Sequence, residues 1–231
     1  MLTVLRREEK YPMRLLESLQ YQNRFSSLLA RDSYSHGGSY MVRSLYFDTA
    51  DDKDYFDKIT EQNLRRKIRL RIYNPDDQVA KLELKQKENI YQRKRSLTIS
   101  RAEAEELIAG NYSVLLSHSE PFAAEMFAIM SKEVYRPKVI VEYQRTAFMA
   151  KENNIRLTFD SQIRATESSV DLFSPTLPLY PVAEADKVIF EVKYDRFMLG
   201  YISDIISTID RRSITSSKYC LARSIGYPLQ L

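Results

Sequence analysis

The chain has 231 residues, of which 44% are hydrophobic and 29% are charged, and its formal net charge is +4 at pH 7. This composition is ordinary for a globular protein, and the length suits one large domain or two small ones. The single cysteine excludes an intramolecular disulfide and is typical of a reducing compartment. The N-terminal segment becomes charged at Arg6, unlike a signal peptide, and no apolar run approaches the ~20 residues that span a bilayer. We therefore expect a cytoplasmic protein without a transmembrane segment.

The N-terminal third is expected to contain a first strand, a helix over residues 12–30 and a second strand over residues 40–48. Pro12 suits the first turn of the helix. The helix would carry Leu15, Leu16, Leu19 and Leu28.

The strongest pattern lies in residues 64–73, where cationic and apolar side chains alternate with a period of two. Such alternation is typical of a strand with one charged and one apolar face. Residues 81–87 repeat it, and the turn signal Asn74-Pro75-Asp76-Asp77 between them predicts a hairpin. A third strand is expected over residues 89–99. The charged positions are Arg65, Lys67, Arg69, Arg71, Lys81, Glu83, Lys85 and Lys87.

The remaining elements follow in a similar order. A capping box from Ser100 to Glu103 and the stop at Gly110 predict a helix ending near residue 109. Pro121 favours a second helix over residues 120–132. β-branched, aromatic or alternating runs predict strands over residues 138–149, 155–160 and 187–194, a long loop over 168–181, and closing helices over 198–210 and 217–225.

These elements predict an α+β fold, with seven or eight strands in a largely antiparallel sheet and helices packed outside it. No repeat or linker is visible, so residues 1–231 are expected to form a single domain. An open sheet with a solvated polar face alternates in the same way. We favour a curled sheet around an anion, because like charges that face one another at low dielectric repel unless an anion lies between them.

Several motifs resemble those of triphosphate tunnel metalloenzymes, and in particular the VTC domain, the polyphosphate polymerase domain of the vacuolar transporter chaperone. The opening Arg6-Arg7-Glu8-Glu9-Lys10-Tyr11 is similar to the family's opening strand, and the other motifs follow in the family's order. They are Tyr46-Phe47-Asp48-Thr49, Arg69-Leu70-Arg71-Ile72-Tyr73, Glu83-Leu84-Lys85, Lys94-Arg95-Ser96, Tyr143-Gln144-Arg145-Thr146-Ala147-Phe148, Arg156-Leu157-Thr158-Phe159-Asp160, Phe190-Glu191-Val192-Lys193 and Ser217-Lys218-Tyr219.

The resemblance covers residues 6–219 and implies an eight-stranded antiparallel β-tunnel that binds ATP, triphosphate or polyphosphate. One departure concerns Arg6, which stands where hydrolytic tunnel enzymes usually keep an acid. The resemblance implies phosphate-gripping roles for Lys10, Arg69, Arg71, Lys85, Lys94, Arg145 and Lys218, and substrate contacts for Arg6, Lys67, Tyr143, Arg156 and Lys193.

A carboxylate among cations suggests a metal ligand, and Glu191 is the strongest candidate. Mn²⁺ or Mg²⁺ would bridge it to phosphate oxygens; the alternative is a salt bridge to a neighbouring Arg or Lys. Glu8 and Glu83 are weaker candidates that could instead orient Lys10 and Lys85.

Three functions fit this pattern. The first is a metal-dependent polyphosphate polymerase that uses ATP, the second a hydrolase of tripolyphosphate or nucleoside triphosphate, and the third a non-catalytic polyphosphate-binding module. Nucleic-acid binding is disfavoured, because the cations alternate along strands and do not form an exposed patch with stacking aromatics. The pattern allows a membrane-protein partner and does not specify the oligomeric state.

Overall fold

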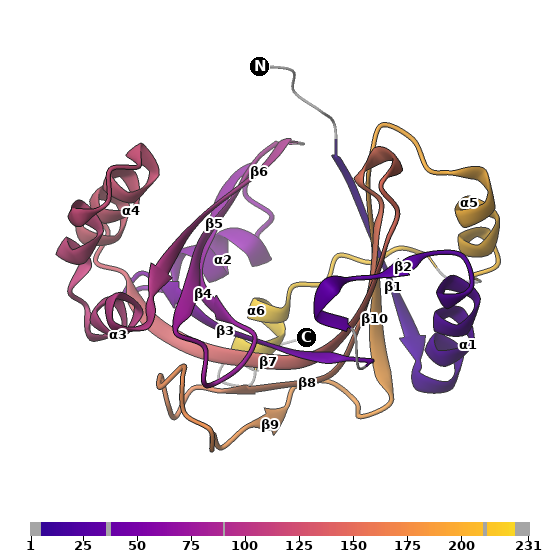
Figure 1. Cartoon of the computed structure of the whole chain (residues 1–231). Helices are drawn as coiled ribbons and strands as arrows, with labels where there is room; N and C mark the ends of the chain where they lie inside the picture. The colour runs from indigo at the N-terminus through magenta and orange to yellow at the C-terminus, as the bar shows by residue number, and fades with distance from the viewer. Residues whose placement is uncertain (1–5, 36–37, 90, 210–211, 225–231) are drawn as a thin grey trace. The chain divides into compact units, whose positions relative to one another are not determined.

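The computed structural model describes residues 6–35, 38–89, 91–209 and 212–224, and contains a ten-stranded sheet (Figure 1). The hydrogen-bonded order is β1-β10-β8-β7-β3-β4-β5-β6, with β2 beside β7 and β9 beside β8. The strands are β1 (Arg6–Arg14), β2 (Ala30–Arg31), β3 (Tyr40–Asp48), β4 (Leu64–Ile72), β5 (Val79–Glu88), β6 (Tyr91–Ser100), β7 (Arg136–Met149), β8 (Arg156–Thr166), β9 (Tyr180–Pro181) and β10 (Lys187–Asp195).

The predicted α+β class with an antiparallel sheet is confirmed. Eight long strands form the path from β1 to β6, and β2 and β9 add two residues each. The pairs β1–β10, β10–β8, β3–β4, β4–β5 and β5–β6 all run antiparallel.

The structure contains every predicted helix, with changed bounds, and one further α-helix, α2 (Lys53–Ile59), that the sequence did not predict. The helix expected over residues 12–30 begins only at Leu15, because Pro12 lies within β1, opposite Ile189 of β10. The closing helices are shorter than expected, and residues 210 and 225 lie outside the described part of the chain. The helices are α1 (Leu15–Ser26), α2 (Lys53–Ile59), α3 (Arg101–Ala109), α4 (Pro121–Lys132), α5 (Gly200–Ser207) and α6 (Lys218–Arg223), with short 3-10 helices η1 (Ser33–Ser35), η2 (Tyr112–Ser117) and η3 (Glu152–Asn154).

Two predicted helix signals work as expected. The Ser100 hydroxyl accepts the backbone N–H of Glu103, and the Glu103 carboxylate accepts the backbone N–H of Ser100, so the capping box at the start of α3 is complete. Gly110 ends α3 with a φ of 92°, a conformation that costs glycine little. Among the described residues, none of the helices has the length and apolar character needed to cross a membrane.

The chain divides into two compact units, each assembled from three segments. Unit 1 comprises residues 1–41, 143–163 and 183–217, and unit 2 comprises residues 42–142, 164–182 and 218–231. Strands β3, β7 and β8 have residues in both units. The prediction of a single domain over residues 1–231 stays a prediction.

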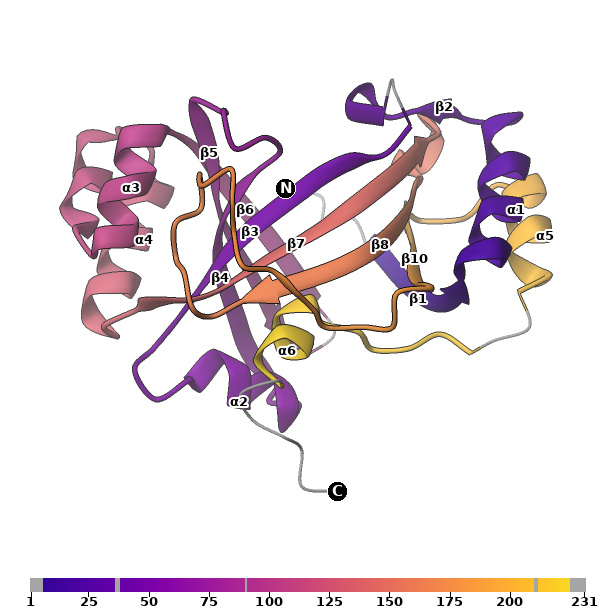
Figure 2. The same cartoon turned by 90° about the horizontal axis from the view of Figure 1, so that it is seen from below.

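The core of unit 1 is an aromatic cluster between the strands and two helices. Helices α1 and α5 lie side by side (Figures 1 and 2), and Phe25 of α1 stacks on Phe190 of β10 with ring centroids 5.9 Å apart. Phe190 in turn stacks on Phe159 of β8 at 4.6 Å. Burial of each such side chain contributes on the order of 1.5–3 kcal/mol. The apolar face of β1, β8 and β10 is thereby covered.

Unit 2 has its own core on the corresponding face of β4, β5 and β6. Leu70, Leu82 and Leu97 lie opposite one another across the three strands and are buried with residues of α3 and α4. These two helices lie side by side on that face of the strands (Figures 1 and 2). The period-two pattern therefore works as predicted: the apolar set packs under helices, and the charged set lies on the opposite face.

Asp54, at the start of α2, is a fully buried carboxyl group in unit 2. It accepts a hydrogen bond of 2.9 Å from the Tyr135 hydroxyl, and Arg66 Nε lies 3.6 Å away. Burial and the nearby Asp48 carboxylate raise the pKa of Asp54 from 3.8 to about 7. The neutral form is therefore favoured in the folded protein below about pH 7.

We expect this group to make the protein less stable as the pH rises from about 4 to about 7. Below pH 3.8 the carboxyl is protonated in both states; between the two pKa values only the unfolded chain ionises it readily, and above pH 7 the penalty is constant. The difference corresponds to on the order of 4 kcal/mol. Urea unfolding of Asp54→Asn between pH 4.5 and 7.5 should show a flatter profile than the wild type. Asp57→Asn on the same helix is the control, and an equal slope for Asp54→Asn would contradict this assignment.

Candidate anion-binding faces

Three neighbouring strands of unit 2 carry a set of mainly cationic side chains on one face. The register places Lys67, Lys85 and Lys94 opposite one another across β4, β5 and β6. Opposed residues of antiparallel strands point the same way, with Cβ atoms about 4.5–5.5 Å apart. We call this surface the β4–β6 charged face; it comprises Arg65, Lys67, Arg69, Arg71, Lys81, Glu83, Lys85, Lys87 and Lys94.

Glu83 is the only carboxylate on this face among the described residues, and it is 2% exposed. Arg69 donates to Glu83 Oε2 through both Nε and Nη2, each at 2.7 Å. Lys94 Nζ lies 2.5 Å from the other oxygen, and Arg71 lies 3.7 Å from Oε2. Burial opposes ionisation of Glu83, but these three cations hold its pKa well below the ordinary value. Glu83 is therefore a permanent anion that orders the surrounding cations.

The same surroundings alter two further groups. Burial lowers the pKa of Lys94 to about 8, although the Glu83 carboxylate acts in the opposite direction. Tyr46 of β3 lies opposite Arg69 and accepts a hydrogen bond of 2.9 Å from its Nη1. Burial opposes ionisation of Tyr46, but Arg69 and Arg71 lower the pKa of its hydroxyl. Both shifts indicate a strongly positive, partly desolvated surface that would bind an anion.

Two buried polar atoms beside Arg69 have no hydrogen-bond partner among the described residues. They are Arg71 Nε and the hydroxyl of Ser44, which lies opposite Arg71 in the β3–β4 register. Arg71 is 8% exposed and Ser44 is 1% exposed. Unsatisfied buried donors are costly. A phosphate oxygen would satisfy both, which is consistent with the predicted phosphate grip of Arg71.

Lys218 is positioned by the docking of α6 within unit 2. Tyr219, the next residue, donates a hydrogen bond of 2.5 Å to Asp48 Oδ2 and stacks on Tyr46 at 5.1 Å. Arg223 donates to Asp52 at 2.6 Å and to Glu167 at 2.8 Å. Helices α2 and α6 lie next to each other in Figure 2. Lys67 Nζ lies 5.9 Å from the Tyr219 ring, so α6 brings Lys218 close to the β4–β6 charged face.

Unit 1 carries a second charged surface on β1 and β10, which comprises Glu8, Lys10, Glu191 and Lys193. The register places Lys10 opposite Glu191 and Glu8 opposite Lys193. Each lysine contacts both carboxylates. Lys10 Nζ lies 3.0 Å from Glu8 and 3.6 Å from Glu191. Lys193 Nζ lies 3.7 Å from Glu8 and 2.5 Å from Glu191. We call this surface the β1–β10 charged face. Its two positive and two negative charges balance, in contrast to the β4–β6 charged face.

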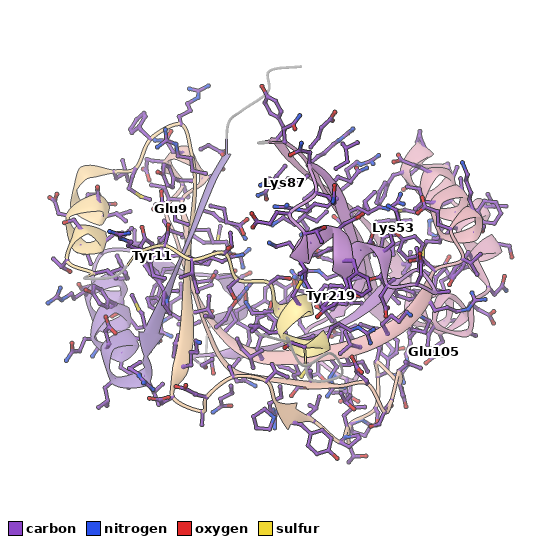
Figure 3. The ribbon with its side chains drawn as sticks, turned by 180° about the vertical axis from the view of Figure 1, so that it is seen from behind. Glu9, Tyr11, Lys53, Lys87, Glu105 and Tyr219 are labelled. Carbon is purple, nitrogen blue, oxygen red and sulfur yellow. The ribbon has the colours of Figure 1, made fainter. Side chains whose placement is uncertain are left out.

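Glu9 and Tyr11, both labelled in Figure 3, belong to the alternate residues of β1. The Tyr11 hydroxyl donates to Glu9 Oε2 at 2.5 Å, and the Tyr11 ring lies 6.1 Å from Phe190. Glu9 is therefore separated from the charged quartet of β1 and β10, because successive side chains of a strand point to opposite faces.

Arg145 of β7 is held by a buried carboxylate that the sequence did not single out as its partner. Its Nε and Nη2 donate to the two oxygens of Asp160 at 2.6 and 2.7 Å. Burial opposes the charge of Arg145, but Asp160 and Glu191 raise the pKa of its guanidinium well above the ordinary value. The guanidinium also lies 5.2 Å from the centre of the Tyr143 ring, so Tyr143 packs against Arg145. Arg145 is thus fixed in orientation before any ligand binds.

Two predicted substrate contacts are less clearly part of these surfaces. Arg156 lies opposite Lys193, but its Nη2 donates to Asp32 at 2.6 Å and to the Tyr40 hydroxyl at 3.2 Å. Arg6 lies opposite Asp195 in the backbone register, and its side chain is outside the described part of the structure.

The three carboxylates predicted as metal ligands lie on two different surfaces. Glu83 is on the β4–β6 charged face, and Glu8 and Glu191 are on the β1–β10 charged face. No group of three or more His, Cys, Asp or Glu side chains suited to a metal occurs within the described residues. However, Thr158 lies opposite Glu191 on β8, is 2% exposed, and its hydroxyl has no hydrogen-bond partner in the described structure. Glu8, Glu191 and Thr158 are hard oxygen donors, which suit Mg²⁺ or Mn²⁺ when phosphate oxygens complete the coordination.

The structure thus groups the predicted residues into two sets. Lys67, Arg69, Arg71, Glu83, Lys85 and Lys94 share the β4–β6 charged face, with Lys218 on α6 nearby. Glu8, Lys10, Glu191 and Lys193 share the β1–β10 charged face. Sequence reasoning missed Asp160 and the hydroxyls of Ser44, Tyr46 and Thr158. Three of these four could have been found from the pairing of strands, because each lies directly opposite a predicted site residue. Ser44 lies opposite Arg71, Tyr46 opposite Arg69, and Thr158 opposite Glu191.

Comparison with solved structures supports this architecture. A candidate adenylate cyclase from Bacillus halodurans has a TM-score of 0.53 at 13% identity, with 93% of each chain covered. A candidate adenylyl cyclase from Hippeastrum, described as having a dominant triphosphatase activity, has a TM-score of 0.53 at 12% identity and covers 94% of this chain and 96% of its own. At these identities the likeness establishes the fold alone. No curated protein matches the sequence.

The antiparallel sheet and its charged strand faces define an α+β protein that shares its fold with these two structures. More particularly, the chain belongs to the VTC domain family, whose model matches residues 5–227.

We expect Glu83→Gln to destabilise the ligand-free protein by about 3 kcal/mol, because removing one partner leaves buried cations uncompensated. Tripolyphosphate should then raise the melting temperature of the variant more than that of the wild type, since the anion replaces the lost charge. Thermal unfolding with and without tripolyphosphate measures both effects. Glu88→Gln, an exposed position on the same strand, is the matched control. Equal destabilisation by both variants would argue against the role assigned to Glu83.

Proposed function

We propose that this VTC domain is a polyphosphate polymerase, a metal-dependent phosphotransferase that moves the γ-phosphoryl group of ATP to a growing inorganic polyphosphate chain. The observation that carries the proposal is the β4–β6 charged face, where eight cations and one carboxylate share one side of three strands. A surface with so large a cationic excess is suited to a linear polyanion. Membership of the VTC domain family supports the same conclusion.

Phosphoryl transfer requires that the phosphate chain be clamped and that the charge developing on its oxygens be neutralised. Arg69 and Arg71 lie two residues apart on one strand, roughly 7 Å along it, and each can bind a phosphoryl group through two N–H donors. Arg69 is already oriented by Glu83 and Tyr46. Its binding geometry is therefore set before the ligand arrives, which lowers the entropic cost of binding.

The lysines supply charge without a fixed fork. Lys85 and Lys94 lie beside each other on β5 and β6, and Lys218 begins α6. In unit 1, Lys10 and Arg145 play the corresponding part, with Arg145 held by Asp160. Lys67, Tyr143, Arg156 and Lys193, together with Arg6, would add contacts along the chain. We assign these residues to binding and to stabilisation of charge; none of them is required to act as a covalent nucleophile.

A divalent ion, Mn²⁺ or Mg²⁺, would be held by Glu191 with Glu8 and the Thr158 hydroxyl. When bound, such an ion would neutralise negative charge on the phosphate oxygens. Lys10 and Lys193 occupy the carboxylate oxygens of Glu191 here, at 3.6 and 2.5 Å. Metal binding would therefore require these ammonium groups to move onto phosphate oxygens, which couples metal and phosphate binding.

A hydrolase of tripolyphosphate or nucleoside triphosphate is the second candidate. The triphosphatase activity attributed to the Hippeastrum protein favours it, because that protein shares the fold. Arg6 counts against it, since hydrolytic members of this class usually carry an acid at that position. The same clamp would then direct water at the γ-phosphorus. A non-catalytic polyphosphate-binding module is the third candidate.

The decisive assay is incubation of the protein with ATP and Mn²⁺, followed by electrophoresis that resolves polyphosphate and by measurement of ADP and free phosphate. We expect a ladder of long chains with release of ADP. Free phosphate without chains would establish the hydrolase instead. Tight binding of tripolyphosphate with neither product would leave the binding module.

We expect Glu191→Gln to lower turnover at least tenfold while changing the affinity for ATP by less than about threefold, because the amide keeps the shape but loses the charge that attracts a metal ion. Initial rates across a Mn²⁺ titration test this, with Glu184→Gln, an exposed acid that pairs with Arg14, as the control. An unchanged metal dependence in Glu191→Gln would remove this residue from the metal site.

We also expect Arg69→Ala to weaken tripolyphosphate binding by at least tenfold, because it loses a bidentate, charge-assisted contact. Arg69→Lys should restore part of this loss, since lysine keeps the charge but lacks the fork. Isothermal titration calorimetry distinguishes the two variants. Equal affinity of wild type and Arg69→Ala would exclude Arg69 from the clamp.

A further inference from the structure

The β4–β6 charged face extends beyond the residues assigned to the triphosphate clamp. Its register defines four cross-strand rows, each two residues further along the strands than the last. From one end to the other, the rows are Arg65–Lys87–Gln92, Lys67–Lys85–Lys94, Arg69–Glu83–Ser96 and Arg71–Lys81–Thr98. The first of these, which we call the rim row, has no assigned function.

The rim row places two cations directly opposite each other. Arg65 of β4 faces Lys87 of β5, and both side chains are half-buried. Within the described residues neither Arg65 nor Lys87 forms an ion pair. Arg65 instead donates a hydrogen bond of 3.2 Å to the backbone carbonyl of Gln62. Directly opposed like charges destabilise a sheet. This pair therefore carries a cost that an anion would remove.

The neighbouring row makes the local charge larger still. Lys67, Lys85 and Lys94 come next along the strands, so five cations occupy two adjacent rows. The single carboxylate of the face, Glu83, lies in the third row and contacts Lys94 from there. Glu88 is on β5 as well, but it follows Lys87 and therefore points to the opposite face. The rim end of the face is thus the more positive end.

The spacing of the rows indicates the length of the ligand. Strands rise about 3.3 Å per residue, so successive rows are about 7 Å apart and the four rows extend over about 20 Å. Three phosphoryl groups joined by bridging oxygens are shorter than this distance. A triphosphate gripped at Arg69 and Arg71 cannot also reach the rim row, whereas a longer chain can.

We propose that Arg65 and Lys87 form an outer phosphate subsite that binds polyphosphate chains longer than a triphosphate and does not contribute to triphosphate binding. The subsite rests on the proposed function, because it continues the same surface. It gives the domain a preference for long chains: each additional phosphoryl group that reaches the rim row adds a favourable charge contact, whereas ATP and tripolyphosphate gain none.

The chemistry of the rim row favours polyphosphate over single-stranded nucleic acid. Nucleic-acid sites of this kind combine cations with aromatic side chains on which bases stack. None of the four rows contains an aromatic residue on β4, β5 or β6. Two rings of neighbouring elements, Tyr46 and Tyr219, lie beside Arg69 and Lys67, which belong to the inner rows and not to the rim row. Tyr91, at the start of β6, lies opposite Glu88 and so belongs to the other face.

The test compares two ligands on one double variant, Arg65→Gln with Lys87→Gln. Isothermal titration calorimetry with tripolyphosphate and with a long-chain polyphosphate gives both affinities in the absence of turnover. We expect the affinity for the long chain to fall about tenfold, as for loss of two partly exposed ion pairs. We expect the affinity for tripolyphosphate to stay within about twofold of wild type.

Salt dependence provides a second readout that a purely structural effect would not change. Each phosphate contact contributes about 0.7–0.9 to the slope of log affinity against log salt concentration, so the slope for the long chain should fall by about 1.5 in the double variant. The slope for tripolyphosphate should be unchanged. The control is Lys53→Gln with Arg93→Gln, which removes the same net charge. Arg93 lies opposite Gln86 on the other face of the sheet. Lys53 lies on α2, outside the four rows; Figure 3 labels both Lys53 and Lys87.

The outcomes separate the two proposals. If wild type binds both ligands and the rim variant binds the long chain as wild type does, the subsite is wrong while the clamp stands. Equal loss for both ligands, or the same loss in the control variant, also overturns it. Competition by a single-stranded oligonucleotide as effective as that by polyphosphate would identify a general polyanion surface instead. If wild type binds neither ligand, the proposed function fails together with the subsite.

Discussion

The ion pairs of Glu83 are the interaction on which the charged face of β4, β5 and β6 depends. Eight cations on one side of three strands would repel strongly, and a buried carboxylate between Arg69, Arg71 and Lys94 offsets part of that repulsion. The carboxylate also fixes the guanidinium of Arg69, which Tyr46 holds from the neighbouring strand. One acid cannot neutralise the whole surface, however. The face is therefore folded and still strongly positive, the combination that a binding site for a polyanion requires.

The two units distribute charge differently, and this difference suggests a division of labour. On β1 and β10 the lysines and glutamates alternate in a balanced quartet, and the contacts range from 2.5 to 3.7 Å. In the proposed function such a surface would exchange partners, with a phosphate taking the ammonium groups and a divalent cation taking the carboxylates. The β4–β6 charged face has too few carboxylates for such an exchange of partners. An incoming phosphate would supply the negative charge that this face lacks. Metal and chain recognition would thus begin from different electrostatic states.

Local periodicity accounts for most of what could be predicted. Alternation with a period of two placed Arg69 and Arg71 on one face and Leu70 on the other, and the hairpin turn gave the pairing of β4 with β5. The preference of proline for a first helical turn misled at Pro12, because β1 pairs along its whole length with β10 and this long-range pairing outweighed the local signal. The partnership of Arg145 with Asp160 was also beyond local reasoning, since it depends on which neighbouring strand supplies the carboxylate. The hydrogen bonds of Arg156 to Asp32 and Tyr40 were likewise not predicted, and its ligand contact stays a prediction.

The docking of α6 has a consequence for how the protein is made. Asp48 and Asp52 are buried acids near residue 50, but Tyr219 and Arg223, which bind them, come from the last segment of the chain that the structure describes. A ribosome that has synthesised β3 to β6 has therefore not yet supplied the groups that satisfy these carboxylates. Unit 2 is therefore expected to remain incompletely ordered until α6 has been synthesised and has docked. The docking of α6 would then complete the fold of unit 2 and add Lys218 to the cations near the β4–β6 charged face in the same step.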